Sequence, residues 1–549
     1  METPGYWQKF SSKRVSRRRA LAAGAASLGA TTFALAGCSS SDSGETETNG
    51  DWTPSPLDTP TPGGKMTYGI NVDVGSLDPH RNIASGFLSA RIHNPLHAVN
   101  MSTQEFQPLV AQKLETPTTQ EYIWTLRPGV RFHDVEPTNG RELTADDVKY
   151  SFDRFKAGPT LNDRKLLTLY SDIYEAVDKQ TFRLKTVRPF SPAVDHVGNF
   201  PYSIVPHEAV EKWEDLSTKA AGCGAWILSD YARGERVRLT RNPNYYQPPR
   251  PYPDEEEWLI VPDTGTLWQT FKSGRLDGSN VYVDKFKRSE IEGNKSFRVV
   301  QSPSLWTNMC YIRVDRPPFS DERVREALDI GIDREDYIEK LYFGDGNFNG
   351  PINWALEYWA LPQEEIREAL KYDPERAKQL LDAADQGSGL SIDCILPTSG
   401  ISPDIATIIA SHYKRLGVTL NLRPLELGAF LGELYAHNFD MAIFFNLPHM
   451  EPDMPLRSYY SKGQSADRNP GMANDPEVDR LIEGIWEIFD LEEKKKAVME
   501  CQRVLLKKHG PMYPLCNEIG YVGSKVRVRG LQEGTGLIGW LGISYWLEG

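Results

Sequence analysis

The sequence predicts an α/β protein built of several lobes, and three observations lead to this prediction. Residues 391–445 alternate strand, helix, strand, helix and strand, an order that forms a parallel sheet through right-handed crossovers. The chain has 549 residues, and at about 100–200 residues per domain its globular part divides into two to four lobes. Hydrophobic residues make up 40% and charged residues 25% of the chain, which is typical of folded globular proteins.

The alternating unit begins with a strand and a well-marked helix. Residues 391–396 form a short apolar run that ends at a proline, as a strand does at the edge of a loop. Residues 402–416 predict a helix, with Ser402 as its N-cap, a proline at the first helical position and an acid in the first turn. Gly417 ends this helix.

The second half of the unit leads into a further helix. Residues 418–422 alternate in polarity with period two and predict a strand, and residues 427–437 predict a helix. Residues 441–445 form a continuous apolar run, as expected of a strand that is buried on both faces. Residues 475–489, with Asp475 as the cap, carry apolar side chains on one side and predict a helix that packs on the sheet.

Earlier elements are marked by local signals. Order is expected to begin near Lys65, with a strand over residues 66–70. Helices are predicted to start at Thr144 and at Ser320, because acidic residues follow each of these positions and apolar residues then recur along one side.

Residues 1–37 resemble an export signal. The pair Arg17-Arg18 is similar to a twin-arginine signal, and Ala20–Ala36 is too short and too weakly apolar for a membrane span of about 20 residues. Leu35–Cys38 resembles a bacterial lipobox, so we expect cleavage before Cys38 and lipidation of that cysteine. The mature protein would then be anchored to the outer face of the cell membrane, in the periplasm or at the cell surface.

The segment 38–64 predicts a disordered tether between the lipid and the globular body, because its Ser, Thr, Pro, Gly and acidic residues bury little apolar surface. The net charge of −13, without a long basic run after the leader, argues against binding to nucleic acid. Twin-arginine export implies folding in the cytoplasm, where early disulfides are not expected.

Cysteine usage does not indicate a disulfide scaffold. If Cys38 carries lipid, an odd number of cysteines remains, and their wide scatter also argues against a zinc cluster. These cysteines are Cys223, Cys310, Cys394, Cys501 and Cys516. One or two disulfides stay open as an alternative that the sequence does not assign.

The candidate binding site follows from the predicted sheet. Ligands of open parallel sheets lie beyond the carboxyl ends of the strands, which are the loops around Ser399 and over residues 446–453. Aromatic side chains elsewhere suit a second rim for a small organic ligand. The resulting candidate ligand-binding residues are Trp306, Trp354, Tyr358, Ser399, Asn446, His449, Glu451 and Asp453.

The sequence carries no established metal or catalytic motif. His93 and His97 have the i, i+4 spacing of helix ligands, but Pro95 lies between them and no third ligand is evident. We therefore expect no metal, no cofactor and no enzymatic activity. An extracellular hydrolase that uses Glu451 and Asp453 is the main rival hypothesis, and a binding module coupled to a sensor is the second.

Seven segments in chain order resemble motifs of the extracytoplasmic solute-binding proteins of ABC transporters, family 5, which serve oligopeptides, dipeptides and nickel. The similarity covers roughly residues 64–520. The segments are 124–134, 143–148, 222–226, 241–246, 271–277, 318–328 and 332–334, which read WTLRPGVRFHD, LTADDV, GCGAW, RNPNYY, FKSGRLD, PFSDERVREAL and IDR.

The resemblance implies a type II periplasmic-binding fold, with two main lobes around a ligand cleft plus an extra lobe. It implies that the chain crosses between the main lobes near residues 305–315 and 500–515, so that the first strand and the C-terminal tail share a lobe. The implied division is lobe I over 65–100, 206–310 and 506–549, the extra lobe II over 101–205, and lobe III over 311–505.

The resemblance also implies a function. The chain would be a monomeric, lipid-anchored receptor that captures a solute by hinge closure and delivers it to the permease of an ABC importer. In the dipeptide-binding branch an aspartate holds the ligand ammonium, but Pro448 stands at that position here, with Glu451 and Asp453 shifted along the chain. The loop around Ser399 also lacks the arginine that holds the ligand carboxylate. A longer peptide is therefore the favoured ligand, with a neutral sugar-like ligand, an aromatic ligand or a nickel complex as alternatives.

Overall fold

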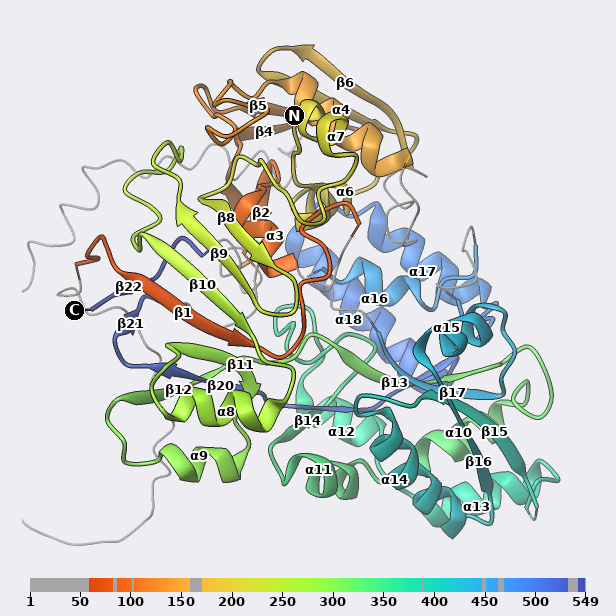
Figure 1. Ribbon diagram of the computed structural model, residues 1–549. Coiled ribbons are helices and arrows are strands. Elements are labelled where there is room, and N and C mark those ends of the chain that lie inside the picture. The colour runs from red at the N-terminus through yellow and green to blue at the C-terminus, as the bar shows by residue number, and fades with distance from the viewer. Residues whose placement is uncertain are drawn as a thin grey trace, which may run out of the picture.

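The computed structural model describes residues 59–81, 86–100, 103–157, 170–387, 389–446, 451–462, 469–531 and 542–548. The expected export signal, Cys38, the tether up to residue 58, Pro448 and His449 lie outside these residues. Three main sheets with their own helices divide the molecule into lobes, with lobe II at the top, lobe I on the left and lobe III on the right of Figure 1.

Lobe I is built on a seven-stranded sheet that the first strand enters at its centre. β1 pairs in parallel with β10 and with β11, and the outer pairs are antiparallel. Its order is β12 (Phe297–Gln301), β20 (Tyr521–Lys525), β11 (Gly278–Tyr282), β1 (Lys65–Ile70), β10 (Glu255–Ile260), β9 (Arg236–Arg241) and β8 (Trp226–Ala232). Its helices are α3 (Gly86–Ile92), α8 (Thr264–Lys272) and α9 (Lys285–Ile291).

Lobe II is an antiparallel sheet with short helices. Its order is β4 (Ala111–Thr118), β5 (Glu121–Leu126), β7 (Thr181–Thr186) and β6 (Ser171–Asp178). Its helices are α4 (Ala145–Ala157), α6 (Ala193–Val197), η2 (Phe200–Tyr202) and α7 (His207–Trp213). Arg154 on α4 binds Asp78 of lobe I, with an Nη1–Oδ1 distance of 2.9 Å, and hydrogen bonds from Arg154 hold the pKa of this buried carboxyl at about 2 against the opposing effect of burial. This pair ties lobe II to lobe I.

Lobe III contains the predicted alternating unit. β15 pairs in parallel with β16 and β17, as expected for a β-α-β-α-β order. The sheet order is β16 (Thr419–Leu425), β15 (Ser391–Pro397), β17 (Met441–Asn446), β13 (Thr307–Ile312) and β18 (Met512–Pro514). Its helices are α10 (Glu322–Ile330), α11 (Arg334–Tyr342), α12 (Gln363–Ala369), α13 (Pro374–Ala383), α14 (Ser402–Arg415), α15 (Leu427–Tyr435), α16 (Asp453–Arg457), α17 (Pro476–Trp486) and α18 (Leu491–Lys508).

Three small sheets complete the strand list. They are β2 (His97–Val99) with β3 (Phe106–Pro108), β14 (Gly346–Phe348) with β19 (Cys516–Glu518), and β21 (Val528–Arg529) with β22 (Trp546–Leu547). β14 and β19 lie where lobe I meets lobe III, so their pairing braces the junction.

The predicted α/β class and the elements that carried it are confirmed, with one corrected cap. Asp475 caps α17 and accepts from the amide of Glu477 at 2.9 Å. Ser402 is not the cap of α14, because Ile401 already has helical dihedrals and serves as the N-cap residue, which places Ser402 inside the first turn.

Strand pairing shifts two of the expected lobe boundaries. The chain leaves the lobe I sheet after β12 and enters the lobe III sheet at β13, so the expected boundary at residue 310 falls inside a strand. β18 pairs with β13, so the return to lobe I follows residue 514 rather than residue 505. α7 packs on α4, and this extends lobe II beyond residue 205.

The five cysteines after the predicted lipidation site are all free and buried. Burial raises the pKa of the thiols of Cys223 and Cys501 to about 12, which leaves them unreactive. The helices among the described residues include none that is long and apolar enough to span a bilayer.

Candidate functional site

Two crossing segments join lobe I to lobe III and lie side by side. Residues 302–306 lead from β12 to β13, and residues 515–520 lead from β18 to β20. The amide of Ser302 donates to the carbonyl of Gly520 at 2.9 Å. Gly520 has φ of 75°, and a Cβ there would lie 2.5 Å from the Ser302 oxygen, so only glycine allows this approach. We call this narrow double crossing, residues 302–306 and 515–520, the hinge.

Buried asparagines hold the hinge together. The Oδ1 atom of Asn517 accepts from the amide of Asn308 at 3.2 Å and from Nδ2 of Asn349 at 2.6 Å, and its Nδ2 donates to the carbonyl of Trp306. Asn353 adds bonds from its Nδ2 to the Ser304 carbonyl and to the Thr307 hydroxyl, each at 3.1 Å. These side chains link both crossing segments to the first strand of lobe III.

The hinge presents an aromatic surface next to the end of β17. The ring of Trp306 meets that of Phe445 edge to face at 4.7 Å, and Phe445 stacks on Phe444 at 4.0 Å. Trp306 is 36% exposed, so part of its ring is free to contact a ligand. Asn446 is the register partner of Thr307, and this places two predicted site residues, Trp306 and Asn446, beside each other.

Trp354 lies next to this surface, because Asn353 is bonded to the crossing segment. Trp354 is buried, and no residue of the described ranges accepts a hydrogen bond from its Nε1. Ser399 is exposed in the loop after β15, at the rim of the sheet. Of these two predicted site residues, Trp354 is therefore buried and Ser399 is open to solvent.

Tyr358 lies in a different environment from the other predicted site residues. Its hydroxyl donates to Oε1 of Glu492 at 3.0 Å, and the ammonium of Lys495 lies 4.2 Å from the centre of its ring. Both partners belong to α18, so Tyr358 is engaged in packing on that helix.

Asp453 and Glu451 are both buried, but Asp453 faces lobe II. Its Oδ2 lies 3.1 Å from Nε2 of His196 on α6. The two acids lie in or beside α16, and the contact with His196 gives Asp453 a role in joining lobe III to lobe II.

Glu518 is a hinge residue that the sequence did not indicate. It lies on β19, and burial raises the pKa of its carboxyl to about 7, although Lys287 opposes this effect. The folded protein therefore releases the proton of Glu518 only near neutral pH, whereas the unfolded chain releases it near pH 4.5.

Replacing Glu518 with glutamine is expected to stabilise the protein above pH 7. Because the folded pKa lies above the unfolded one, the wild type loses stability as pH rises from about 4.5 to 7, by about 3 kcal/mol in total. Urea unfolding at pH 5 and pH 8 measures this difference. Glu518→Gln is expected to unfold at higher urea only at pH 8, and Glu292→Gln, at an exposed position on the end of α9, is the control. Equal shifts at both pH values would contradict the assignment.

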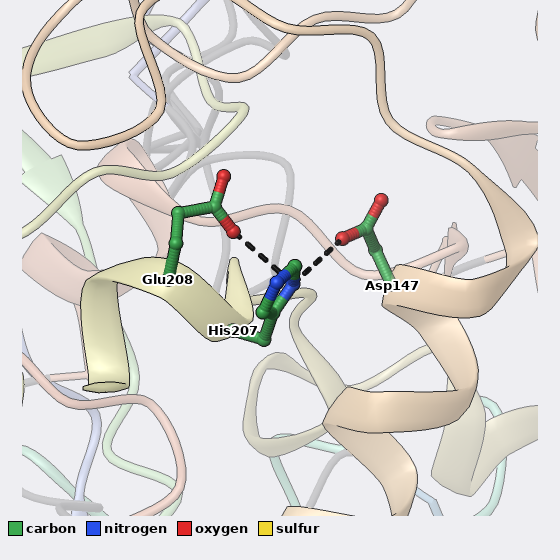
Figure 2. Close-up of side chains that lie close together, drawn as sticks. All are labelled: Asp147, His207 and Glu208. Carbon is green, nitrogen blue, oxygen red and sulfur yellow. Dashed lines mark ion pairs between the residues drawn. The ribbon is translucent and has the colours of Figure 1, made fainter. Parts of the chain in front are cut away.

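An acidic and histidine cluster in lobe II is held by an arginine. Figure 2 shows Asp147, His207 and Glu208, with His207 Nδ1 3.2 Å from Glu208 and 4.0 Å from Asp147. The guanidinium of Arg141 donates to both oxygens of Asp147, at 2.9 and 2.6 Å, and to Glu208 at 2.8 Å. Because this one cation bridges both carboxylates, the cluster is explained as the ion-pair network that fixes α7 on α4.

Three sheets, a double crossing and an aromatic surface at the hinge match a known architecture. Residues 105–467 match the family described as bacterial extracellular solute-binding proteins, family 5. The chain belongs to this family. The predicted family and the type II periplasmic-binding fold are thereby confirmed.

Relatives of this solute-binding protein bind several kinds of solute. Heme-binding protein A of Haemophilus influenzae is 24% identical over 83% of this chain and 87% of its own length. Periplasmic oligopeptide-binding protein OppA of Salmonella typhimurium is 25% identical over 81% of this chain and 86% of its own length. The structure of DppA from Helicobacter pylori with the peptide STSA has a TM-score of 0.75 and 22% identity, and the alignment covers 89% of this chain and 99% of DppA.

Sequence reasoning missed the hinge asparagines and Glu518. Asn308, Asn349 and Asn517 lie far apart in the chain and carry no local motif, so only strand pairing across the lobes brings them together.

Proposed function

We propose that this protein is the lipid-anchored receptor of an ABC importer, and that it captures an extracellular solute, with a peptide as the favoured ligand. The two lobes close around the hinge over the solute, and the closed form delivers it to the membrane permease. The double crossing between the lobe I and lobe III sheets is the observation that carries this proposal. Only two short, adjacent segments of chain connect these sheets, so one lobe can rotate against the other.

The chemistry at the hinge supports an organic ligand with polar groups. Trp306 offers an aromatic face, and Trp354 offers a buried N–H group without an acceptor among the described residues. Peptide carbonyls accept such hydrogen bonds, and aromatic faces contact their side chains. The names of the relatives support both peptide and heme as ligand classes, so the experiment has to distinguish them.

Mass spectrometry of the small molecules that co-purify with the protein tests the ligand. A bound peptide is expected. A sugar, a heme or a nickel complex would overturn the peptide assignment, and catalytic turnover of added peptides or glycosides would overturn the receptor function. Lipid anchoring is tested separately, because Cys38→Ala is expected to release the protein from membranes.

Trp306→Ala is expected to weaken ligand binding about tenfold or more, which corresponds to about 1.4 kcal/mol. Because a third of Trp306 is exposed, the protein should still fold, and circular dichroism verifies this. Isothermal titration with the peptide identified by mass spectrometry measures the affinity. Tyr358→Ala is the matched aromatic control, since Tyr358 packs on α18 and its loss should leave the affinity unchanged. Equal effects of both substitutions would argue against Trp306 as a ligand contact.

A further inference from the structure

Lobes II and III touch each other although the chain joins neither directly to the other. Lobe II is an insertion whose chain enters and leaves through lobe I, and the Arg154–Asp78 pair ties it there. Its contact with lobe III is therefore noncovalent. A rotation of lobe III about the hinge moves it against lobes I and II. The contact between lobes II and III can therefore break while the hinge stays intact.

The first part of the contact is aromatic. Trp486, at the end of α17, is fully buried, and its ring lies 5.4 Å from Tyr170 and 5.9 Å from Phe190 of lobe II. The guanidinium of Arg188 lies 5.1 Å from the centre of the same ring. The amide of Ser191 donates to the carbonyl of Trp486 at 2.7 Å. Opening would expose most of this indole to water, so the aromatic part favours the closed arrangement.

The second part of the contact is charged and buried. Lys494 Nζ on α18 lies 3.6 Å from Oδ2 of Asp195, and His196 Nε2 lies 3.1 Å from Oδ2 of Asp453. The exposed fractions of these side chains are 7%, 11%, 6% and 0%, so each of these polar groups has left water. The 3.6 Å separation of Lys494 and Asp195 is long for a charge-assisted hydrogen bond, and burial raises the pKa of Asp195 even with Lys494 beside it, so the attraction compensates only in part for desolvation. The charged part therefore opposes closure.

Several polar atoms at the contact have no partner among the described residues. They are Oγ of Ser191, Nε1 of Trp359, Nε1 of Trp486 and Oδ1 of Asp453. A cavity of about 20 Å³, lined in part by Ser191, Asp195, Trp359 and Lys494, is large enough for one water molecule. The remaining unpaired atoms are hydrated only when the lobes separate, which adds to the cost of closure.

We propose that the contact between lobes II and III is a balanced latch for the closed receptor. Trp486 holds the lobes together, whereas the buried Asp195–Lys494 pair and the unpaired polar atoms weaken this hold, so that the ligand-free protein populates both the closed and the open form. The inference rests on the proposed hinge closure. It adds a second place, far from the hinge, where the duration of ligand binding is set.

Fluorescence energy transfer between lobes II and III of the ligand-free protein tests the latch. The full mature chain with Cys38→Ala carries the exposed substitutions Lys179→Cys in lobe II and Lys414→Cys in lobe III, because the native thiols are buried and do not take label. Trp486→Ala is expected to lower the closed population at least tenfold. The double variant Asp195→Leu/Lys494→Met is expected to raise it by a similar factor, because it replaces buried charges with apolar side chains.

Two single substitutions serve as matched comparisons. Lys494→Met leaves Asp195 buried without its cation and is expected to open the protein. Lys495→Met removes the neighbouring lysine, whose ammonium lies over the ring of Tyr358 within lobe III, and should change nothing. If the double variant opens the protein, or if it and Trp486→Ala both leave the transfer efficiency unchanged, the latch is refuted. Because no ligand is added, this result is independent of the ligand search, whose failure would concern the proposed function alone.

Discussion

Asn517→Ala is expected to destabilise the protein by about 3 kcal/mol or more and to abolish ligand capture. The substitution leaves the amide of Asn308, the Nδ2 group of Asn349 and the carbonyl of Trp306 without their partner in the buried hinge. Each buried group that loses its partner costs about 1–3 kcal/mol. Because Trp306 loses its anchor to the second crossing segment, the aromatic surface at the hinge should also move. Urea unfolding and ligand titration measure the two effects.

Asn421→Ala is the matched control for the hinge asparagine. Asn421 lies on the edge strand β16, is exposed, and its Nδ2 donates to Ser391 at 2.8 Å and to Asp393 at 3.1 Å. Water replaces these bonds when the side chain is removed, so a loss below about 0.5 kcal/mol is expected. If Asn517→Ala were as mild as Asn421→Ala, the asparagine network would not hold the hinge.

Stability is expected to fall steeply as the pH drops below about 6.5, because three buried histidines must stay neutral in the folded protein. Burial lowers the pKa of His93 and His97 to about 3 and that of His133 to about 4. The unfolded chain binds these protons near pH 6.5, so unfolding gains about 1.4 kcal/mol per pH unit for each histidine between pH 6.5 and 4. Urea unfolding from pH 7 to pH 4.5 at constant ionic strength measures this slope.

His97→Gln should reduce the slope of the unfolding free energy against pH by the contribution of one histidine, which is about 1.4 kcal/mol per pH unit. Burial lowers the pKa of His97 although the bond from its Nε2 to the carbonyl of Val194, at 2.9 Å, opposes this effect. Protonation of its Nδ1 would also break the bond that this atom accepts from Nε1 of Trp124 at 3.3 Å. His207→Gln, at a side chain that is 49% exposed, is the control and should leave the slope unchanged. An unaltered slope in the His97 variant would show that this histidine does not oppose acid unfolding.

Local sequence signals located those helices and strands whose structure depends on interactions within a single segment. The apolar run at 441–445 became β17 because a strand buried on both faces needs little else, and Asp475 capped α17 because its carboxylate reaches the amides of its own first turn. The cap of α14 was wrong because helical dihedrals at Ile401 depend on how the preceding loop leaves the sheet. Trp306 and Asn446 were selected separately, and the pairing of β13 with β17 placed them side by side.

The sequence by itself determined the family and the α/β class and predicts the export address, since these depend on motifs and periodicities that lie within short segments. The tertiary structure alone decided where the hinge lies, which predicted residues gather there and which, like Tyr358, belong to packing. The physical reason is that the hinge depends on contacts between residues about 200 positions apart, such as Asn308 with Asn517. No local pattern encodes a partner at that distance, because only the folded sheets bring the two crossing segments together.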